Sequence, residues 1–166
     1  ARGGMEAGGL DDFFLKPLLV LLFRKTDMFI AVNGGIRRRL LQEGYGEDTI
    51  VQIPNGVDTQ AFFPVTHRER TALREKFGFA GKTIFLYSGR LVKGKGLDLL
   101  AGAMTRVVRE VPEALLVLIG AGDYAATIRD TARLTQIEAV VRMEGAVEQV
   151  ADYLNAADIF VFPSLS

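Results

Sequence analysis

From residue 82 onward, short apolar segments alternate with longer segments whose apolar residues recur at helical spacing. The segment TIFLYS, residues 83–88, is a continuous apolar run, which is typical of a strand buried on both faces of a sheet. Strands that alternate with helices require parallel pairing and right-handed crossovers, so the sequence predicts an α/β fold with a parallel sheet. The expected strands are 83–88, 115–120, 140–145 and 159–162, and the expected helices are 97–111, 124–136 and 147–157.

The first third of the chain shows a similar order of elements. The expected elements are a helix over 10–25, a strand over 28–32, a helix that starts at residue 36 and ends at Gly44 or Gly46, and a strand over 49–54. The segment PNGVDTQAFFP, residues 54–64, is rich in turn-forming residues and predicts a connector. We therefore place a domain boundary near Pro64, which divides the chain into residues 1–64 and 65–166. A charged helix, closed at Gly78, is expected soon after the boundary.

The composition excludes several classes of protein. A formal net charge of zero argues against a nucleic-acid binder that depends on attraction to phosphates. The absence of cysteine excludes disulfides, thiolate metal sites and a cysteine nucleophile. The apolar run 18–23 is far too short to span a bilayer, and the single histidine, His67, is expected at the surface. The chain stops within an apparent strand-to-loop transition, FVFPSLS, so we expect it to be a fragment of a longer protein.

The loop after the strand at 83–88 carries the strongest functional signal. Arg90 follows the carboxyl end of this strand, and Lys95 stands in a glycine-broken loop before the next helix. Ligands of parallel sheets bind beyond the carboxyl ends of the strands, and a helix N-terminus attracts anions. We therefore predict a phosphate or diphosphate site, although solvated loop charges are the usual fate of such side chains.

Two glycine patterns nearby leave alternatives open. Gly89, Gly94 and Lys95 fit a P-loop, but Gly96 stands where that motif needs the serine or threonine that holds magnesium, so a P-loop phosphotransferase is disfavoured. The turn 120–122, Gly-Ala-Gly, follows the second strand, but a full dinucleotide fingerprint needs a glycine at Ala125. For this turn, a steric role and a ligand-facing role both remain possible.

Three further features are expected to be mainly structural. Asp123 is a candidate N-cap for the helix that follows it. Asp158 is expected to make local hydrogen bonds rather than to take part in catalysis. The run of three arginines at 37–39 is expected on a solvated helix face, with contact to an anionic membrane surface as the alternative.

The motifs together resemble those of one enzyme family. IPNGVDTQAFFP, YSGRLVKGKGLDLL, VLIGAG, VRMEGAV and LNAADIFVFPSLS occur in the order found in retaining glycosyltransferases of the GT-B fold, family four (glycosyl transferases group 1). The resemblance covers residues 27–166, and the Gly-Arg loop and NGVD are its most specific parts. It implies a two-domain architecture of Rossmann-like parallel sheets with flanking helices. In that architecture, residues 1–64 resemble the end of the acceptor domain, and 65–166 resemble the first part of a truncated donor domain.

The resemblance also implies site residues. Gly89, Arg90 and Lys95 would bind the diphosphate of the donor, and the two cations would stabilise the leaving group without a metal ion or a cofactor. Residues 143–145, Met143, Glu144 and Gly145, would lie near the nucleotide base. The family's pair of donor-site glutamates would follow Ser166, so it is absent from this chain. Asn33 stands where family members often have serine.

The expected function is transfer of a sugar from a nucleotide-diphosphate sugar to an acceptor, with retention of configuration. The alternative is a non-catalytic nucleotide or phosphosugar binding module. The acceptor could be a carbohydrate, a lipid or a small molecule, and no nucleic acid is expected as a partner. We expect a cytoplasmic location, with peripheral contact to the inner face of the membrane left open. The chain of residues 1–166 alone is expected to be inactive.

Overall fold

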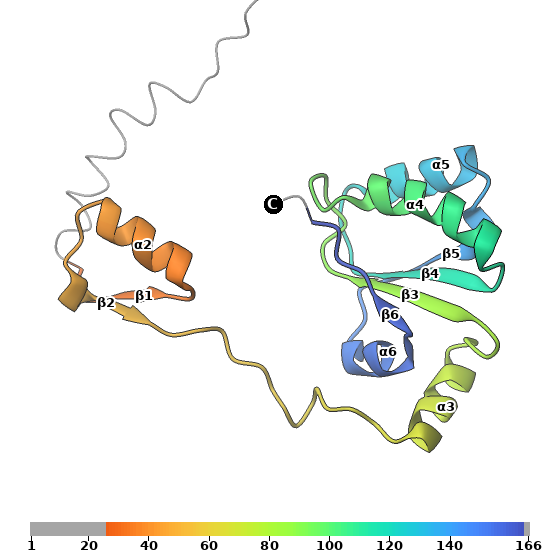
Figure 1. The fold of residues 1–166 in the computed structure, drawn as a ribbon, viewed down its shortest axis with the longest axis horizontal. Coiled ribbons are helices and arrows are strands. Elements are labelled where there is room, and N and C mark those ends of the chain that lie inside the picture. The colour runs from red at the N-terminus through yellow and green to blue at the C-terminus, as the bar shows by residue number, and fades with distance from the viewer. Residues whose placement is uncertain (1–25, 165–166) are drawn as a thin grey trace, which may run out of the picture. The chain divides into compact units, whose positions relative to one another are not determined.

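A computed structural model describes residues 26–164 of the chain (Figure 1). The helix expected over 10–25 lies outside the described residues. The chain separates into two compact units, Ala1–Val57 and Asp58–Ser166, and the division falls within the connector expected from the sequence. The assignment of the two units to an acceptor and a donor domain stays a prediction.

The N-terminal unit contains a small parallel sheet with one helix between its strands. Its elements are β1 (Phe29–Ala31), α2 (Gly34–Gln42), the 3-10 turn η1 (Glu47–Thr49) and β2 (Ile50–Gln52). The two strands pair in parallel from Phe29 opposite Ile50 to Ala31 opposite Gln52. Helix α2 begins after Asn33, whose side-chain oxygen accepts a hydrogen bond from the amide of Ile36 at 2.9 Å. The unit is therefore a βαβ arrangement, as the sequence predicts.

The arginines of α2 lie on its surface, and two of them pair with carboxylates. Arg37 pairs with Glu47, and Arg39 pairs with Glu43 one helical turn away.

Within residues 26–164, no helix is both long enough and apolar enough to cross a bilayer.

The C-terminal unit is a four-stranded parallel sheet with helices on both faces (Figure 1). The strands lie in the order β5-β4-β3-β6, with α4 and α5 on one face of the sheet and α6 on the other. Its elements are α3 (His67–Lys76), β3 (Thr83–Ser88), α4 (Leu97–Glu110), β4 (Ala114–Ile119), α5 (Ala125–Leu134), η2 (Glu138–Val140), β5 (Val141–Gly145), α6 (Val150–Ala156) and β6 (Ile159–Phe160). The predicted α/β fold is therefore confirmed.

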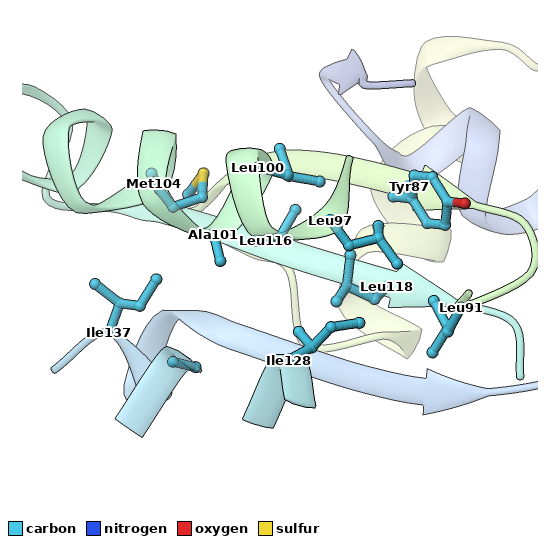
Figure 2. Close-up of a cluster of buried hydrophobic side chains, with 12 residues drawn as sticks. Tyr87, Leu91, Leu97, Leu100, Ala101, Met104, Leu116, Leu118, Ile128 and Ile137 are labelled. Atoms are coloured by element: carbon cyan, nitrogen blue, oxygen red, sulfur yellow. The ribbon is translucent and has the colours of Figure 1, made fainter. Parts of the chain in front are cut away.

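Strand β3 forms the centre of two hydrophobic clusters. Ile84 and Leu86 pack on the side of α6, in a cluster that contains Tyr153. Tyr87 packs on the opposite face, against residues of α4 and α5 such as Leu97 (Figure 2). Because successive side chains of a strand point to opposite faces, burial on both faces requires an uninterrupted apolar run.

Most element boundaries differ from the sequence prediction by one to a few residues, and two of these differences lie near the carboxyl edge of the larger sheet. The expected N-cap role of Asp123 is wrong: Tyr124 occupies the N-cap of α5, and no side chain caps the helix there. The amide of Tyr124 instead donates to the carbonyl of Leu91 at 3.0 Å, so backbone contact with the loop after β3 sets the start of the helix. Strand β6 ends at Phe160, two residues before the expected end at 162.

Asp158 connects three elements of the C-terminal unit. Its carboxylate accepts hydrogen bonds from the amide of Ile84 at 2.8 Å, from Arg70 at 2.7 Å and from Arg74 at 3.0 Å. The same two arginines donate to backbone carbonyls at the end of α6. Asp158 therefore makes hydrogen bonds, as predicted, but they are not local: they reach Arg70, Arg74 and Ile84, which are far away in sequence, and they hold α3 against the sheet.

We expect Asp158→Asn to reduce stability more at neutral pH than in acid. Burial alone would raise the pKa of Asp158, but the hydrogen bond from Ile84 and the two arginines outweigh it and leave this pKa below its usual value. A lowered folded-state pKa contributes stability above the unfolded-state pKa of about 4, and this contribution is lost as pH falls through the folded-state pKa. The loss at pH 7 should be about 1–3 kcal/mol, the range for hydrogen bonds to a charged group.

Urea unfolding at pH 7 and near pH 3 measures this effect. Asp130→Asn is the matched control, because Asp130 is exposed on α5. If both variants lose the same free energy of unfolding at both pH values, Asp158 has no special role in stability.

Candidate functional site

A hollow of about 300 Å³ opens at the carboxyl ends of three adjacent strands of the C-terminal unit. The ends of β3 and β4, the segment after β5 and the first turn of α6 supply its lining. The lining residues are Ser88, Gly89, Arg90, Ile119, Gly120, Ala121, Ala146, Val147 and Val150. This edge is where parallel sheets bind ligands, and the lining combines apolar walls with one guanidinium.

Backbone hydrogen bonds hold the loops around the hollow together. The amide of Gly89 donates to Ile119 at 3.0 Å, the amide of Leu91 donates to Ala121 at 2.9 Å, and the amide of Gly120 donates to Gly145 at 2.6 Å. The loops after β3 and β4 and the end of β5 therefore form one connected edge. A ligand in the hollow would meet a wall whose backbone is already ordered.

The glycines of the turn 120–122 are required by close backbone contact. A Cβ atom on Gly120 would lie 1.9 Å from the carbonyl oxygen of Gly89, and one on Gly122 would lie 2.1 Å from that of Leu91. Of the two roles left open by the sequence, the steric role is confirmed for both glycines. Gly120 also lines the hollow, so the close contact brings the Gly89–Arg90 turn to its wall.

The geometry at Gly96 agrees with the case against a P-loop. Gly96 is the N-cap of α4 and has a left-handed backbone, with φ +67°. A Cβ atom there would lie 2.1 Å from the carbonyl oxygen of Pro163. Because a serine or threonine cannot occupy this position without a shift of the backbone, the loop cannot supply the magnesium-holding hydroxyl of a P-loop.

The two predicted cations stand at the same edge of the sheet, beside different strands. Arg90 is exposed and lines the hollow beside β4 and β5. Lys95 is half-buried on the side of β6, where its Nζ atom lies 3.1 Å from the hydroxyl of Ser164 and 5.9 Å from the ring centre of Phe162. The convergence of Arg90 and Lys95 on one ligand stays a prediction.

The three residues predicted near a nucleotide base point in different directions. Met143 packs against the cluster under α4 and α5. Glu144 pairs with Arg142 and interacts with Tyr153, and burial, with a smaller contribution from Glu144, raises the pKa of this tyrosine. Gly145 does not line the hollow, but its carbonyl accepts a hydrogen bond from Gly120, which does. The base-binding role of these residues stays a prediction.

The sequence interpretation missed several lining residues. Ser88, Val147 and Val150 were not singled out, although they lie at or soon after the ends of expected strands. Position relative to a strand end was the available signal. Val147 and Val150 follow β5, and they could be assigned to the same site as Arg90 only after the order of the strands in the sheet was known.

A parallel α/β unit with an arginine-bearing loop at the carboxyl edge of its sheet belongs to the broad class of nucleotide- and phosphate-binding folds. Within this class, a family model described as "Glycosyl transferases group 1" matches residues 69–166, which is more than half of the chain. The chain belongs to this glycosyltransferase family.

Curated relatives of similar sequence are bacterial glycosyltransferases and synthases. Mannosylfructose-phosphate synthase of Agrobacterium fabrum is 34% identical over 158 residues, covering 87% of this chain and 34% of the relative. The GDP-mannose-dependent monoacylated alpha-(1-6)-phosphatidylinositol monomannoside mannosyltransferase of Corynebacterium glutamicum is 33% identical over 143 residues, covering 84% of this chain and 37% of the relative. The chain therefore spans about a third of the length of these relatives.

Solved structures show the same fold at lower sequence identity. HepE of Anabaena in complex with UDP superposes with a TM-score of 0.78 at 20% identity, covering 90% of this chain and 42% of HepE. WaaG, a glycosyltransferase involved in lipopolysaccharide biosynthesis, superposes with a TM-score of 0.71 at 17% identity, covering 96% of this chain and 46% of WaaG. The fold is that of GT-B glycosyltransferases.

Proposed function

We propose that this chain supplies the donor-binding part of a longer retaining glycosyltransferase that uses a nucleotide-diphosphate sugar. The observation that carries the proposal is the hollow at the carboxyl edge of the sheet, with Arg90 on its wall. Its apolar lining suits a nucleoside, and its guanidinium suits a phosphate. The related HepE structures contain UDP and UDP-glucose, which supports a nucleotide-sugar donor.

The chemistry assigned to Arg90 and Lys95 is stabilisation of a leaving group. The bond between the anomeric carbon and the diphosphate breaks while the acceptor oxygen forms a new bond on the same face of the sugar. The acceptor hydroxyl passes its proton to the departing diphosphate oxygen. Negative charge grows on the diphosphate in this step, so cations fixed beside it lower the barrier. Gly89 lets the backbone turn at this point, because its φ is +155°.

Helix α4 is the third contributor to this anion site. Its N-cap is Gly96, and no side chain caps the first turn, so the amides of that turn are not satisfied by a capping side chain. The positive end of the helix dipole favours an anion there. We assign no metal ion and no cofactor to the step, because two cations and a helix end supply the positive charge.

The substrates are proposed only as chemical classes. The donor is a nucleotide-diphosphate sugar, and the acceptor is a carbohydrate, a lipid or a small molecule. One relative is named for a phosphatidylinositol mannoside acceptor and another for a sugar phosphate product, so relatives alone do not select among these classes. We propose a cytoplasmic location, with peripheral membrane contact if the acceptor is a lipid.

We expect the transferase that contains this chain to remain active after treatment with EDTA and to release a product with the donor's anomeric configuration. The physical reason is that side chains, rather than a metal, neutralise the diphosphate. Donor consumption can be followed with UDP-glucose and GDP-mannose, and NMR coupling constants give the anomeric configuration of the product. Loss of activity on chelation, restored by Mg²⁺ or Mn²⁺, would contradict the metal-independent step. Donor binding without any turnover would favour a non-catalytic binding module.

A further inference from the structure

We infer that Tyr87 is a positioning residue for both cations of the proposed diphosphate site, holding Arg90 through its hydroxyl and Lys95 through its ring. This inference rests on the proposed function. Tyr87 is the penultimate residue of β3, and its side chain is fully buried, at 0% exposure. Its hydroxyl contacts Arg90 and its ring stacks on Phe162, which lies beside Lys95, although Tyr87 does not line the hollow itself.

The hydroxyl of Tyr87 holds the backbone at Arg90. It donates a hydrogen bond to the carbonyl oxygen of Arg90 at 3.0 Å, and the hydroxyl points toward the loop after β3 (Figure 2). A Cβ atom on Gly89 would lie only 2.9 Å from the same hydroxyl oxygen. The glycine and the tyrosine therefore fit each other, and the hydroxyl fills the space that a side chain at residue 89 would need.

The ring of Tyr87 reaches the second cation through Phe162. The two rings lie nearly parallel, with 5.8 Å between their centres and an angle of 8°. The Nζ atom of Lys95 lies 5.9 Å from the centre of the Phe162 ring, within the range of a cation–π contact. Phe162 follows β6, so this stack joins the end of β3 to the side of the edge where Lys95 stands.

Tyr87 stays a hydrogen-bond donor at neutral pH. Burial raises the pKa of its phenol, while the nearby charge of Arg90 opposes the increase. A buried hydroxyl needs a partner, so a purely structural tyrosine would also be bonded. Two features distinguish Tyr87. Its hydroxyl bonds to the backbone carbonyl of Arg90, the residue that we propose to bind the diphosphate, and its ring stacks on Phe162, which lies beside Lys95.

Tyr87→Phe tests the hydroxyl, since it removes one oxygen and keeps the ring stack. Titration calorimetry of the 166-residue chain with inorganic diphosphate gives the affinity of the anion site. We expect the affinity to fall about three- to ten-fold, the range for one net hydrogen bond. Tyr153→Phe is the matched control, because Tyr153 is also nearly buried, at 7%, but belongs to the cluster on the opposite face of the sheet. It should lower the thermal midpoint without changing the affinity.

Amide hydrogen exchange gives a second readout that needs no ligand. The amide of Leu91 bonds to Ala121 and follows the carbonyl that Tyr87 holds, so its exchange reports opening of this loop. In Tyr87→Phe, the exchange of Leu91 should rise more than that of Val117 in the buried strand β4. In Tyr153→Phe, the two amides should change together.

Phe162→Leu tests the ring stack. Phe162 is 55% exposed, so the substitution should have little effect on folding. The substitution removes the aromatic ring between Tyr87 and Lys95. We expect weaker diphosphate binding and an unchanged amide exchange rate at Leu91. Unchanged affinity in this variant would overturn the link to Lys95.

The outcomes separate this inference from the proposed function. If the wild-type chain binds diphosphate and Arg90→Ala abolishes binding, the anion site is supported. If Tyr87→Phe then binds as the wild type does and its Leu91 exchange is unchanged, Tyr87 is only a core residue and the inference is overturned. If the wild-type chain binds no diphosphate, the proposed function fails. The exchange measurement still decides in that case whether Tyr87 orders the loop.

Discussion

Replacing Arg90 by alanine should lower the turnover of the transferase that contains this chain by roughly 10²–10³, the effect of losing one transition-state hydrogen-bond donor. Arg90 stands on the wall of the hollow, in a turn held by the bond between Gly89 and Ile119. The guanidinium therefore needs little reorganisation when charge develops on the leaving diphosphate. Its contribution should be larger in the transition state than in the bound donor, so kcat should fall more than KM rises.

Two further variants make this result interpretable. Arg106→Ala removes an exposed arginine from the middle of α4, and it should leave kcat unchanged. Arg90→Lys keeps the charge but removes the planar fork, so it should recover only part of the lost rate. If Arg90→Ala raises KM while kcat stays the same, Arg90 contributes uniform binding of the donor, and its assignment to the chemical step is wrong.

The sequence predicted the fold best where local pattern and tertiary burial agree. The expected strand 83–88 has the bounds of β3, because a strand buried on both faces must be apolar throughout. The start of α5 was predicted less well, because it depends on a backbone contact between Tyr124 and Leu91, which are 33 residues apart in sequence. No local capping signal at Asp123 could have revealed this contact.

The sequence was sufficient to place the candidate site at one edge of the sheet, but not to say which residues lie next to one another there. The rule that ligands bind at the carboxyl ends of parallel strands drew attention to Arg90 and Lys95, and both lie at that edge of the sheet, while their role as ligands stays a prediction. The strand order β5-β4-β3-β6 then sets Arg90 beside the hollow and Lys95 beside β6, and the sequence does not state this order. The alternation of side chains along β5 likewise sends Met143 and Glu144 to different faces of the sheet.

Close backbone approach at Gly120 is the feature of this edge most sensitive to substitution. We expect Gly120→Ala to reduce the free energy of unfolding by about 3–5 kcal/mol, combining backbone strain with overpacking. Its φ of +132° is rarely adopted by residues with a side chain. The new methyl group would also lie 1.9 Å from the carbonyl oxygen of Gly89, which is backbone and cannot rotate away.

Gly102→Ala provides the opposite expectation from the same chemical change. Gly102 is exposed within α4, and a Cβ atom there meets nothing within 4 Å. Alanine should stabilise this position by about 0.5–1 kcal/mol, the difference in helix propensity. Urea unfolding of both variants measures the contrast. If Gly120→Ala is as stable as the wild type, the loops after β3 and β4 can separate without cost. The rigid wall that we propose to hold Arg90 beside the diphosphate would then not exist.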